Sequence, residues 1–123
     1  MAQVIAIAAG GALGALLRYW VSISVHAVLG RGFPYGTLVV NVMGSLLMGY
    51  LFVLLLERLA VGAVWRAAIL IGVLGGFTTF STFSVETINL LEQGAFARAL
   101  LNILLSVTLC VAAAWLGVLW GRQ

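Results

Sequence analysis

The chain has 123 residues, of which 64% are hydrophobic and only 7% are charged, and its mean hydropathy is +1.23. Soluble domains carry about 25% charged residues, so the composition excludes a soluble fold and predicts an all-α integral membrane protein. The net charge of +3 comes from arginines scattered singly along the chain. Scattered arginines are typical of helix ends at a membrane surface, so we expect a lipid bilayer as a partner and no nucleic acid.

Four transmembrane helices account for most of the sequence, because one membrane-spanning helix takes about 20 apolar residues. We place them at about 4–29, 37–56, 65–91 and 96–120, as one four-helix domain over residues 1–123. The first helix is expected to be retained, since Met1-Ala2-Gln3 lacks the basic residue that begins a signal peptide. The chain's one proline, Pro34, lies in the first predicted turn.

The arginines divide almost evenly between the two membrane faces that four spans predict. Arg58 and Arg66 lie in the second connection and Arg122 at the C-terminus, whereas Arg31 and Arg98 lie on the other side together with Arg18, unless Arg18 is within the membrane. An excess of arginine on one face normally sets orientation. Chance in a short sequence is one explanation, and insertion in both orientations followed by antiparallel homodimerisation is the other.

Two of the predicted helices carry a polar stripe at three- and four-residue spacing, which places each stripe on one helix face. In the second helix the stripe contains Thr37, Asn41, Gly44, Ser45 and Met48, and in the last helix it contains Asn102, Ser106 and Cys110, continued by Ala113, Ala114 and Gly117. Small and polar residues commonly join membrane helices, and the same is expected of the Gly-x-x-x-Gly pairs Gly10–Gly14 and Gly72–Gly76. The alternative is a narrow polar path, in which the neutral amide of Asn41 can donate hydrogen bonds to an anion.

The stretch from Gly75 to Ser84 is the most unusual part of the sequence, because it places adjacent glycines, three phenylalanines and five hydroxyl groups inside the third predicted span. Glycine costs about 1 kcal/mol of helix propensity relative to alanine. We therefore predict a break near residues 75–79 that is lined by protein or by a wet cavity, as broken backbone in a bilayer requires.

The predicted break offers partners for ions of both signs. A first half-helix ending near Gly75 presents carbonyl oxygens, which suit a cation. A second half-helix starting near residues 79–81 presents free N–H groups to an anion, and Ser81, Thr82 and Ser84 are candidates to cap these ends or to continue the polar track. Phe80 and Phe83 share a helix face, and the positive edges of their rings can contact a dehydrated anion, although core packing is the commoner role.

Ionisable residues inside a membrane are functional by default, which directs attention to Arg18 and Glu86. Either side chain can instead reach the membrane surface from its helix, and His26 is interpreted as an interfacial residue. A catalytic triad, a paired-carboxylate site or a metal cluster cannot be assembled from these residues. We therefore predict that the chain is not an enzyme.

Three segments together resemble the CrcB/Fluc family of fluoride channels. They are Gly10-Gly11-Ala12-Leu13-Gly14 with Arg18, then Gly36-Thr37-Leu38-Val39-Val40-Asn41, and finally the run from Gly75 to Glu86. The resemblance covers the whole chain, and the last segment is the most specific of the three. It implies a passive, fluoride-selective channel of the cytoplasmic (inner) membrane, built as a dual-topology antiparallel homodimer with two pores.

The resemblance also implies roles for individual residues. The fluoride pore would be lined by Phe80 and Phe83 edge-on, by the amide of Asn41 and by a polar track, with the following members: Thr37, Ser81, Thr82, Glu86 and Ser106. A structural sodium ion at the dimer centre would be held by the main-chain carbonyls of Gly75 and Thr78. Arg18 matches a first-helix arginine of the family, and its role is left open.

Two other functions fit a small four-helix membrane protein. A multidrug-type exporter can use dual topology, but it needs a carboxylate deep in its first helix to couple protons to its substrate, and the first helix here contains no acidic residue. A membrane subunit without transport activity would leave the polar Phe/Ser/Thr stretch without a purpose.

Overall fold

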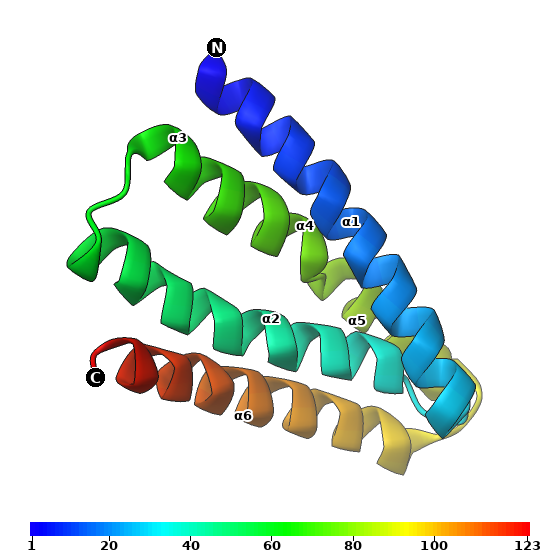
Figure 1. Ribbon diagram of the computed structural model, residues 1–123. Helices are drawn as coiled ribbons and strands as arrows, with labels where there is room; N and C mark the ends of the chain where they lie inside the picture. Colours follow the sequence, from blue (N-terminus) through cyan, green and yellow to red (C-terminus); the bar gives the residue numbers. More distant parts are fainter.

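The computed structural model describes residues 1–123 and is entirely helical apart from short links (Figure 1). Four helical spans are long and apolar enough to cross a membrane, as predicted: Ala2–Leu29, Tyr35–Arg58, Ala63–Glu92 and Phe96–Gly121. Their ends lie within two residues of the predicted ends. The N-terminus, the second link and the C-terminus lie at one end of the molecule (Figure 1), which is the arrangement expected for four antiparallel spans.

Two of the spans are single regular helices and two are composite. The elements are α1 (Ala2–Leu29), α2 (Tyr35–Val53), the π-helix η1 (Leu54–Arg58), α3 (Ala63–Arg66), the π-helix η2 (Ala67–Leu74), α4 (Gly75–Phe77), α5 (Phe80–Glu92) and α6 (Phe96–Gly121). Neither π-helical stretch was foreseen from the sequence. Such stretches are rare and usually short, and hydropathy does not distinguish them from α-helix.

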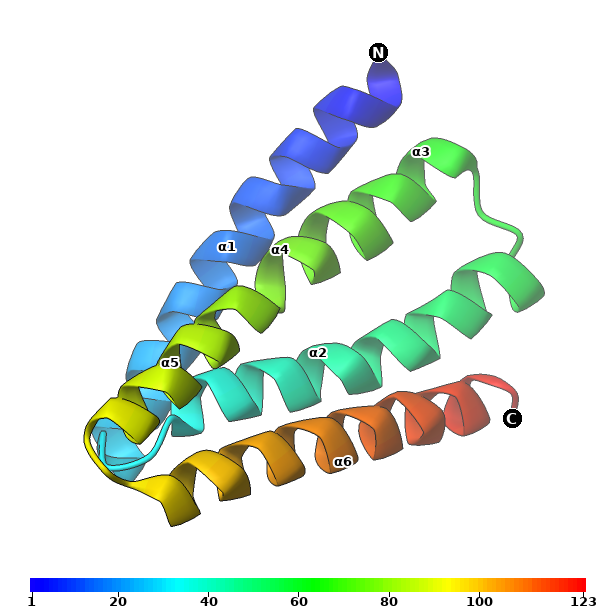
Figure 2. The ribbon, with the colours of Figure 1, turned by 180° about the vertical axis from the view of Figure 1, so that it is seen from behind.

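Helices α2 and α6 lie side by side along most of their length (Figures 1 and 2). Their backbones approach closely at two glycines. A Cβ atom on Gly49 would collide with the carbonyl oxygen of Ala114, and one on Gly117 would collide with the carbonyl oxygen of Leu46. Small residues allow this close approach in membranes, where packing rather than exclusion of water joins the helices.

Helix α1 packs against η2 and α4 in the same way, through glycines that allow the backbones to approach closely. A Cβ atom on Gly10 would meet the carbonyl oxygen of Ala68, and one on Gly14 would meet that of Val73. Across the interface, a Cβ atom on Gly76 would lie 2.7 Å from the carbonyl oxygen of Gly11. The expected packing role of the two Gly-x-x-x-Gly pairs is therefore confirmed.

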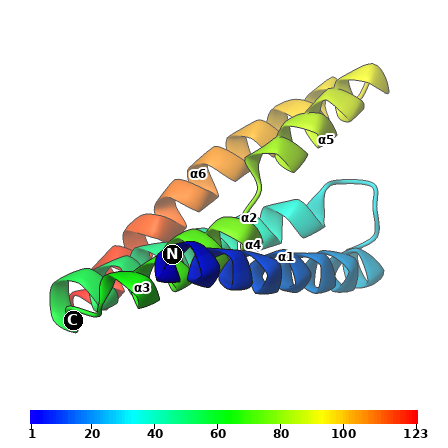
Figure 3. The same ribbon diagram turned by 90° about the horizontal axis from the view of Figure 1, so that it is seen from above.

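The third span changes direction between α4 and α5, and α5 then runs beside α6 and away from α1 (Figure 3). The non-helical residues are Thr78, with φ −83° and ψ 154°, and Thr79, with φ −152° and ψ 114°. The change of direction falls inside the range 75–79 that was predicted for the break, but the first half-helix ends two residues beyond Gly75, because Gly75 keeps helical dihedrals and the helix continues to Phe77. The chain leaves the helix where the backbone of Thr79 finds other hydrogen-bond partners.

Few side chains are buried within one copy of the chain, namely 25 of 123 residues. Several of the buried ones are polar: Thr37, Thr79, Thr87, Asn102 and Ser106. Buried polar groups are normally hydrogen-bonded, and these residues gather around the change of direction in the third span. This region is the candidate site.

Candidate functional site

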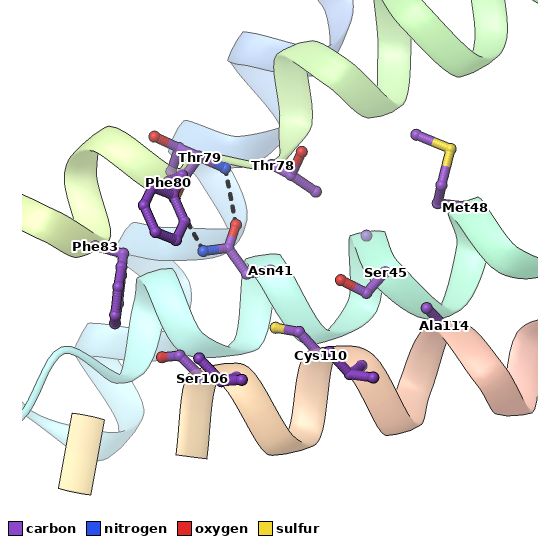
Figure 4. Close-up of a pocket in the computed structure, with 13 residues that line it drawn as sticks. Asn41, Ser45, Met48, Thr78, Thr79, Phe80, Phe83, Ser106, Cys110 and Ala114 are labelled. Atoms are coloured by element: carbon purple, nitrogen blue, oxygen red, sulfur yellow. Dashed lines mark hydrogen bonds between the residues drawn. The ribbon is translucent and has the colours of Figure 1, made fainter. Parts of the chain in front are cut away.

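The amide of Asn41 on α2 binds both backbone groups of Thr79. Asn41 Nδ2 donates to the carbonyl oxygen of Thr79 at 2.9 Å, and the N–H of Thr79 donates to Asn41 Oδ1 at 2.8 Å (Figure 4). A carboxamide presents a donor and an acceptor side by side, so one side chain satisfies two groups that a bilayer could not. The sequence left this amide with two possible roles, helix packing and anion binding; one of its two N–H groups and its oxygen bind the backbone of the neighbouring span, and the other N–H group is left for an anion.

Thr79 also caps the second half of the span. Its Oγ1 accepts a hydrogen bond from the N–H of Thr82 at 3.3 Å and donates to Thr82 Oγ1 at 3.0 Å. Of the two roles left open for Ser81, Thr82 and Ser84, capping is therefore excluded, since Thr79 is the N-cap of α5 and Ser84 donates back to the carbonyl oxygen of Phe80. The preference for threonine directly before a helix was the signal that could have found it. No other side chain accepts a hydrogen bond from the first turn of α5.

Thr78 and Thr79 form the joint between α4 and α5. A cavity of about 410 Å³ lies beside this joint and is called the break cavity. Both predicted polar stripes reach it, Asn41, Gly44, Ser45 and Met48 from α2 and Ser106, Cys110 and Ala114 from α6; Thr78, Thr79, Phe80, Phe83, Val107 and Val111 complete the lining (Figure 4). The stripes thus join the helices and line a cavity at the same time. Thr37 and Asn102 lie outside its lining.

Phe80 and Phe83 stand together at the break cavity, as their spacing predicted (Figure 4). Their ring centroids are 5.2 Å apart and the ring planes are inclined by 47°. Phe83 is 8% exposed, whereas Phe80 is 75% exposed. One ring is therefore held in place by this chain, and the other has little packed against it within a single copy.

Glu86 has an unusual environment on the other side of α5. Its Oε1 accepts a hydrogen bond from Thr37 Oγ1 at 2.6 Å, while its Oε2 is buried without a hydrogen-bond partner. Glu86 and Thr37 line a second cavity of about 320 Å³, the Glu86 cavity, together with Arg18, Thr79 and Thr82. The side chain of Glu86 thus turns towards α2 and does not extend along α5 to the membrane surface.

Arg18 and Glu86 share this cavity without forming an ion pair within 4 Å, since the one ion pair of the chain joins Arg122 to Glu57. Thr79 and Thr82 belong to the same lining, and Thr79 also lines the break cavity. The structure therefore brings most of the predicted polar track to the two sides of one joint. Ser81 lies 3.4 Å from Thr79 Oγ1 through its Oγ, but it lines neither cavity.

A hydrogen-bonded chain supports the cavity wall from behind. Ser106 Oγ donates to Asn102 Oδ1 at 3.5 Å, Asn102 Nδ2 donates to Thr87 Oγ1 at 2.9 Å, and Thr87 Oγ1 donates to the carbonyl oxygen of Phe83 at 2.8 Å. Sequence reasoning missed Thr87. Its position four residues after Phe83 was the available signal, because threonine in a helix commonly bonds the carbonyl one turn back.

The carbonyl oxygens of Gly75 and Thr78 lack the donors that they would have in an unbroken helix. The N–H of Thr79, which would cover Gly75, bonds to Asn41, and the N–H of Thr82, which would cover Thr78, bonds to Thr79 Oγ1. Main-chain carbonyls of this kind are suitable ligands for a small hard cation. The carbonyl oxygens of these two residues therefore fit, as ligands, the sodium ion that the resemblance implies.

Four apolar spans around a cavity that is lined by an amide, hydroxyl groups and two phenylalanine rings define a multi-pass membrane protein with a candidate site between its helices. The model of the family described as CrcB-like protein, camphor resistance (CrcB), matches residues 5–118. The chain belongs to the CrcB-like family, which confirms the resemblance drawn from its motifs.

Curated relatives from several bacteria are similar to the chain. A protein of Methylococcus capsulatus is 56% identical over 118 residues, which are 96% of this chain and 52% of that protein. Proteins of Coxiella burnetii and Magnetococcus marinus are 55% and 54% identical, each over 98% of both chains. The chain thus spans about half of the first relative and nearly all of the other two. All three are named "Fluoride-specific ion channel FluC". The family consists of ion channels, and the prediction that the chain is not an enzyme is confirmed.

Proposed function

We propose that the chain is a passive, fluoride-selective channel that releases fluoride across the cytoplasmic membrane and so reduces its toxicity. The names of the relatives, at 54–56% identity, support fluoride as the permeant ion. The observation that carries the proposal is the break cavity, where an amide, hydroxyl groups and two phenylalanine rings surround a space between apolar helices. Family membership favours the channel over an exporter or a subunit without transport activity.

Chemistry at the break cavity suits a small anion that has lost water. The second N–H of Asn41 Nδ2 is free to donate. The hydroxyl group of Ser106 also lines the cavity and could donate to an anion after rotating away from Asn102 Oδ1, which lies 3.5 Å away. The edges of Phe80 and Phe83 carry partial positive charge, and the first turn of α5 adds the positive end of a helix dipole. Neutral donors and ring edges attract an anion without holding it as firmly as a fixed cation would, and weak binding is needed for conduction.

The assembly that we propose is an antiparallel homodimer with two pores. Its support is the even division of arginines between the two ends and the 75% exposure of Phe80 beside a cavity that one copy leaves partly open. A second copy would cover this ring. The carbonyls of Gly75 and Thr78 would hold a sodium ion at the centre of the dimer. There the ion would supply positive charge and link the breaks in the third spans of the two copies.

The first test is fluoride release from liposomes that contain the purified protein. We expect rapid electrogenic efflux of fluoride without efflux of chloride. Release of neither ion would refute the proposed function, and equal release of both would refute selectivity. A positively charged drug that accumulates against its gradient would instead support the exporter.

Replacing Phe80 or Phe83 with isoleucine removes a ring edge but keeps an apolar side chain. Edge contacts between aromatic rings contribute about 0.5–1.5 kcal/mol. For a contact of similar strength between a ring edge and the anion, we expect each variant to slow fluoride efflux by roughly two- to tenfold while the dimer still assembles. Leu100→Ile, which changes an exposed apolar residue of α6 outside the cavity lining, is the matched control. Unchanged efflux in both phenylalanine variants would rule out a role for the ring edges.

A further inference from the structure

A third cavity, of about 320 Å³ and lined mainly by polar residues, lies at the end of the molecule opposite the two termini and is called the outer cavity. Its charged walls come from four parts of the chain: His26 from α1, Arg31 from the first link, Glu86 from α5 and Arg98 from α6. Asn89 adds an amide. No function described so far uses His26, Arg31 or Arg98.

The outer cavity has more positive than negative charge, because Arg31 and Arg98 face a single carboxylate. Arg98 Nη1 donates to the carbonyl oxygen of Gly32 at 3.2 Å, which holds its guanidinium against the link while its other N–H groups remain available. Arg31 makes no hydrogen bond or ion pair within the chain, as the one ion pair lies at the far end between Arg122 and Glu57. Two guanidinium groups are thus left to attract an anion.

Glu86 connects the outer cavity with the conduction path proposed above, because this residue lines both the outer cavity and the Glu86 cavity. Thr79 lies in the lining of the Glu86 cavity and also in that of the break cavity. The three cavities therefore follow one another along α5, from the charged end to the phenylalanine pair. An anion held by Arg31 and Arg98 would be next to the start of this route.

His26 lines the outer cavity and joins α1 to the start of α2, because its Nε2 accepts a hydrogen bond from the N–H of Gly36 at 3.3 Å. Glu86 is the acidic group in the same cavity.

We propose that the outer cavity is a loading site for small inorganic anions, in which Arg31 and Arg98 raise the local concentration of fluoride. The proposal rests on the proposed function. Charged clefts raise the rate of encounter with an oppositely charged ion by about 10- to 1,000-fold, and the effect falls as salt screens it. Arg31 and Arg98 therefore act on capture and not on passage through the phenylalanine pair.

The test compares fluoride efflux at limiting and at saturating fluoride for the double variant Arg31→Gln/Arg98→Gln. At low ionic strength we expect efflux at limiting fluoride to fall about tenfold, while efflux at saturating fluoride stays near the wild-type value. The salt dependence of the wild type should largely disappear. Arg66→Gln/Arg122→Gln, which removes the same charge at the other end of the chain, is the matched control and should keep both properties.

Each outcome decides between distinct claims. Wild-type efflux and salt dependence in the double variant, or an equal loss in the control, would overturn the loading site. An inactive wild-type protein would overturn the proposed function instead. Normal efflux at saturating fluoride shows that the variant is folded. If the double variant fails to fold, the single variant Arg31→Gln removes a side chain without partners in the chain, and its efflux at limiting fluoride should fall about threefold.

Discussion

Replacing Asn41 with aspartate is expected to reduce fluoride efflux about a hundredfold. The carboxylate has nearly the same shape, but it cannot donate to the carbonyl oxygen of Thr79, a bond that Asn41 Nδ2 makes at 2.9 Å. It also places a negative charge in the wall of a cavity proposed to hold an anion. Like charges at close range cost several kcal/mol, and about 3 kcal/mol corresponds to roughly a hundredfold change in rate.

The measurement is the initial rate of fluoride efflux per folded dimer, with the dimer quantified by size-exclusion chromatography. Asn102→Asp is a matched control, because Asn102 is buried at 2% exposure and donates to Thr87, yet it lines no cavity of the proposed path. We expect the control to lose stability and to lose far less efflux per folded dimer. Equal losses in the two variants would contradict a place for Asn41 in the anion path.

The second large effect is expected in the packing of α2 against α6. Gly117→Val would place a branched side chain against the carbonyl oxygen of Leu46, where even a Cβ atom collides. The obstructing atom belongs to a helix backbone, so relief requires the two helices to separate. Overpacking of this kind costs about 3 kcal/mol, and we expect a melting temperature lower by roughly 10 °C or a loss of folded protein.

Thermal unfolding in detergent, followed by tryptophan fluorescence, checks this expectation. Gly11→Ala is the matched control, since a Cβ atom there would lie 4.0 Å from its nearest neighbour, the carbonyl oxygen of Gly72. The control should melt near the wild-type temperature. A Gly117→Val protein that melts with the control would show that α2 and α6 are less closely packed than their glycines indicate.

Much of the fold could be predicted because hydropathy acts over about 20 neighbouring residues. The four spans followed from composition, and the close packing of α1 followed from the spacing of Gly10 and Gly14. The break was predicted near residues 75–79, and the first half-helix ends two residues beyond Gly75, because glycine lowers helix propensity without preventing a helix. Its true end depends on Asn41, which is 38 positions away from Thr79 in the sequence.

The site divides in the same way. Phe80 and Phe83 could be paired from local spacing, and the structure places both at the break cavity. The bond between Thr37 and Glu86 joins residues that are 49 positions apart, and nothing in one sequence shows whether Glu86 turns towards Thr37 or extends to the membrane surface. The two hydrogen bonds from Asn41 to the backbone of Thr79 could not be predicted for another reason, because an amide that can bind an anion can equally bind backbone N–H and C=O groups.

The joint at Thr79 has a mechanical consequence. Before the joint, η2 and α4 are packed against α1, and after it α5 is packed against α6. The two halves of the third span therefore belong to different helix pairs (Figure 3). Asn41, on a third helix (α2), holds the backbone of Thr79 in place through two hydrogen bonds. A rotation of α5 relative to α1 would be centred on Thr79 and would move Phe80 and Phe83. The carbonyls of Gly75 and Thr78, on the other side of Thr79, would stay with α1.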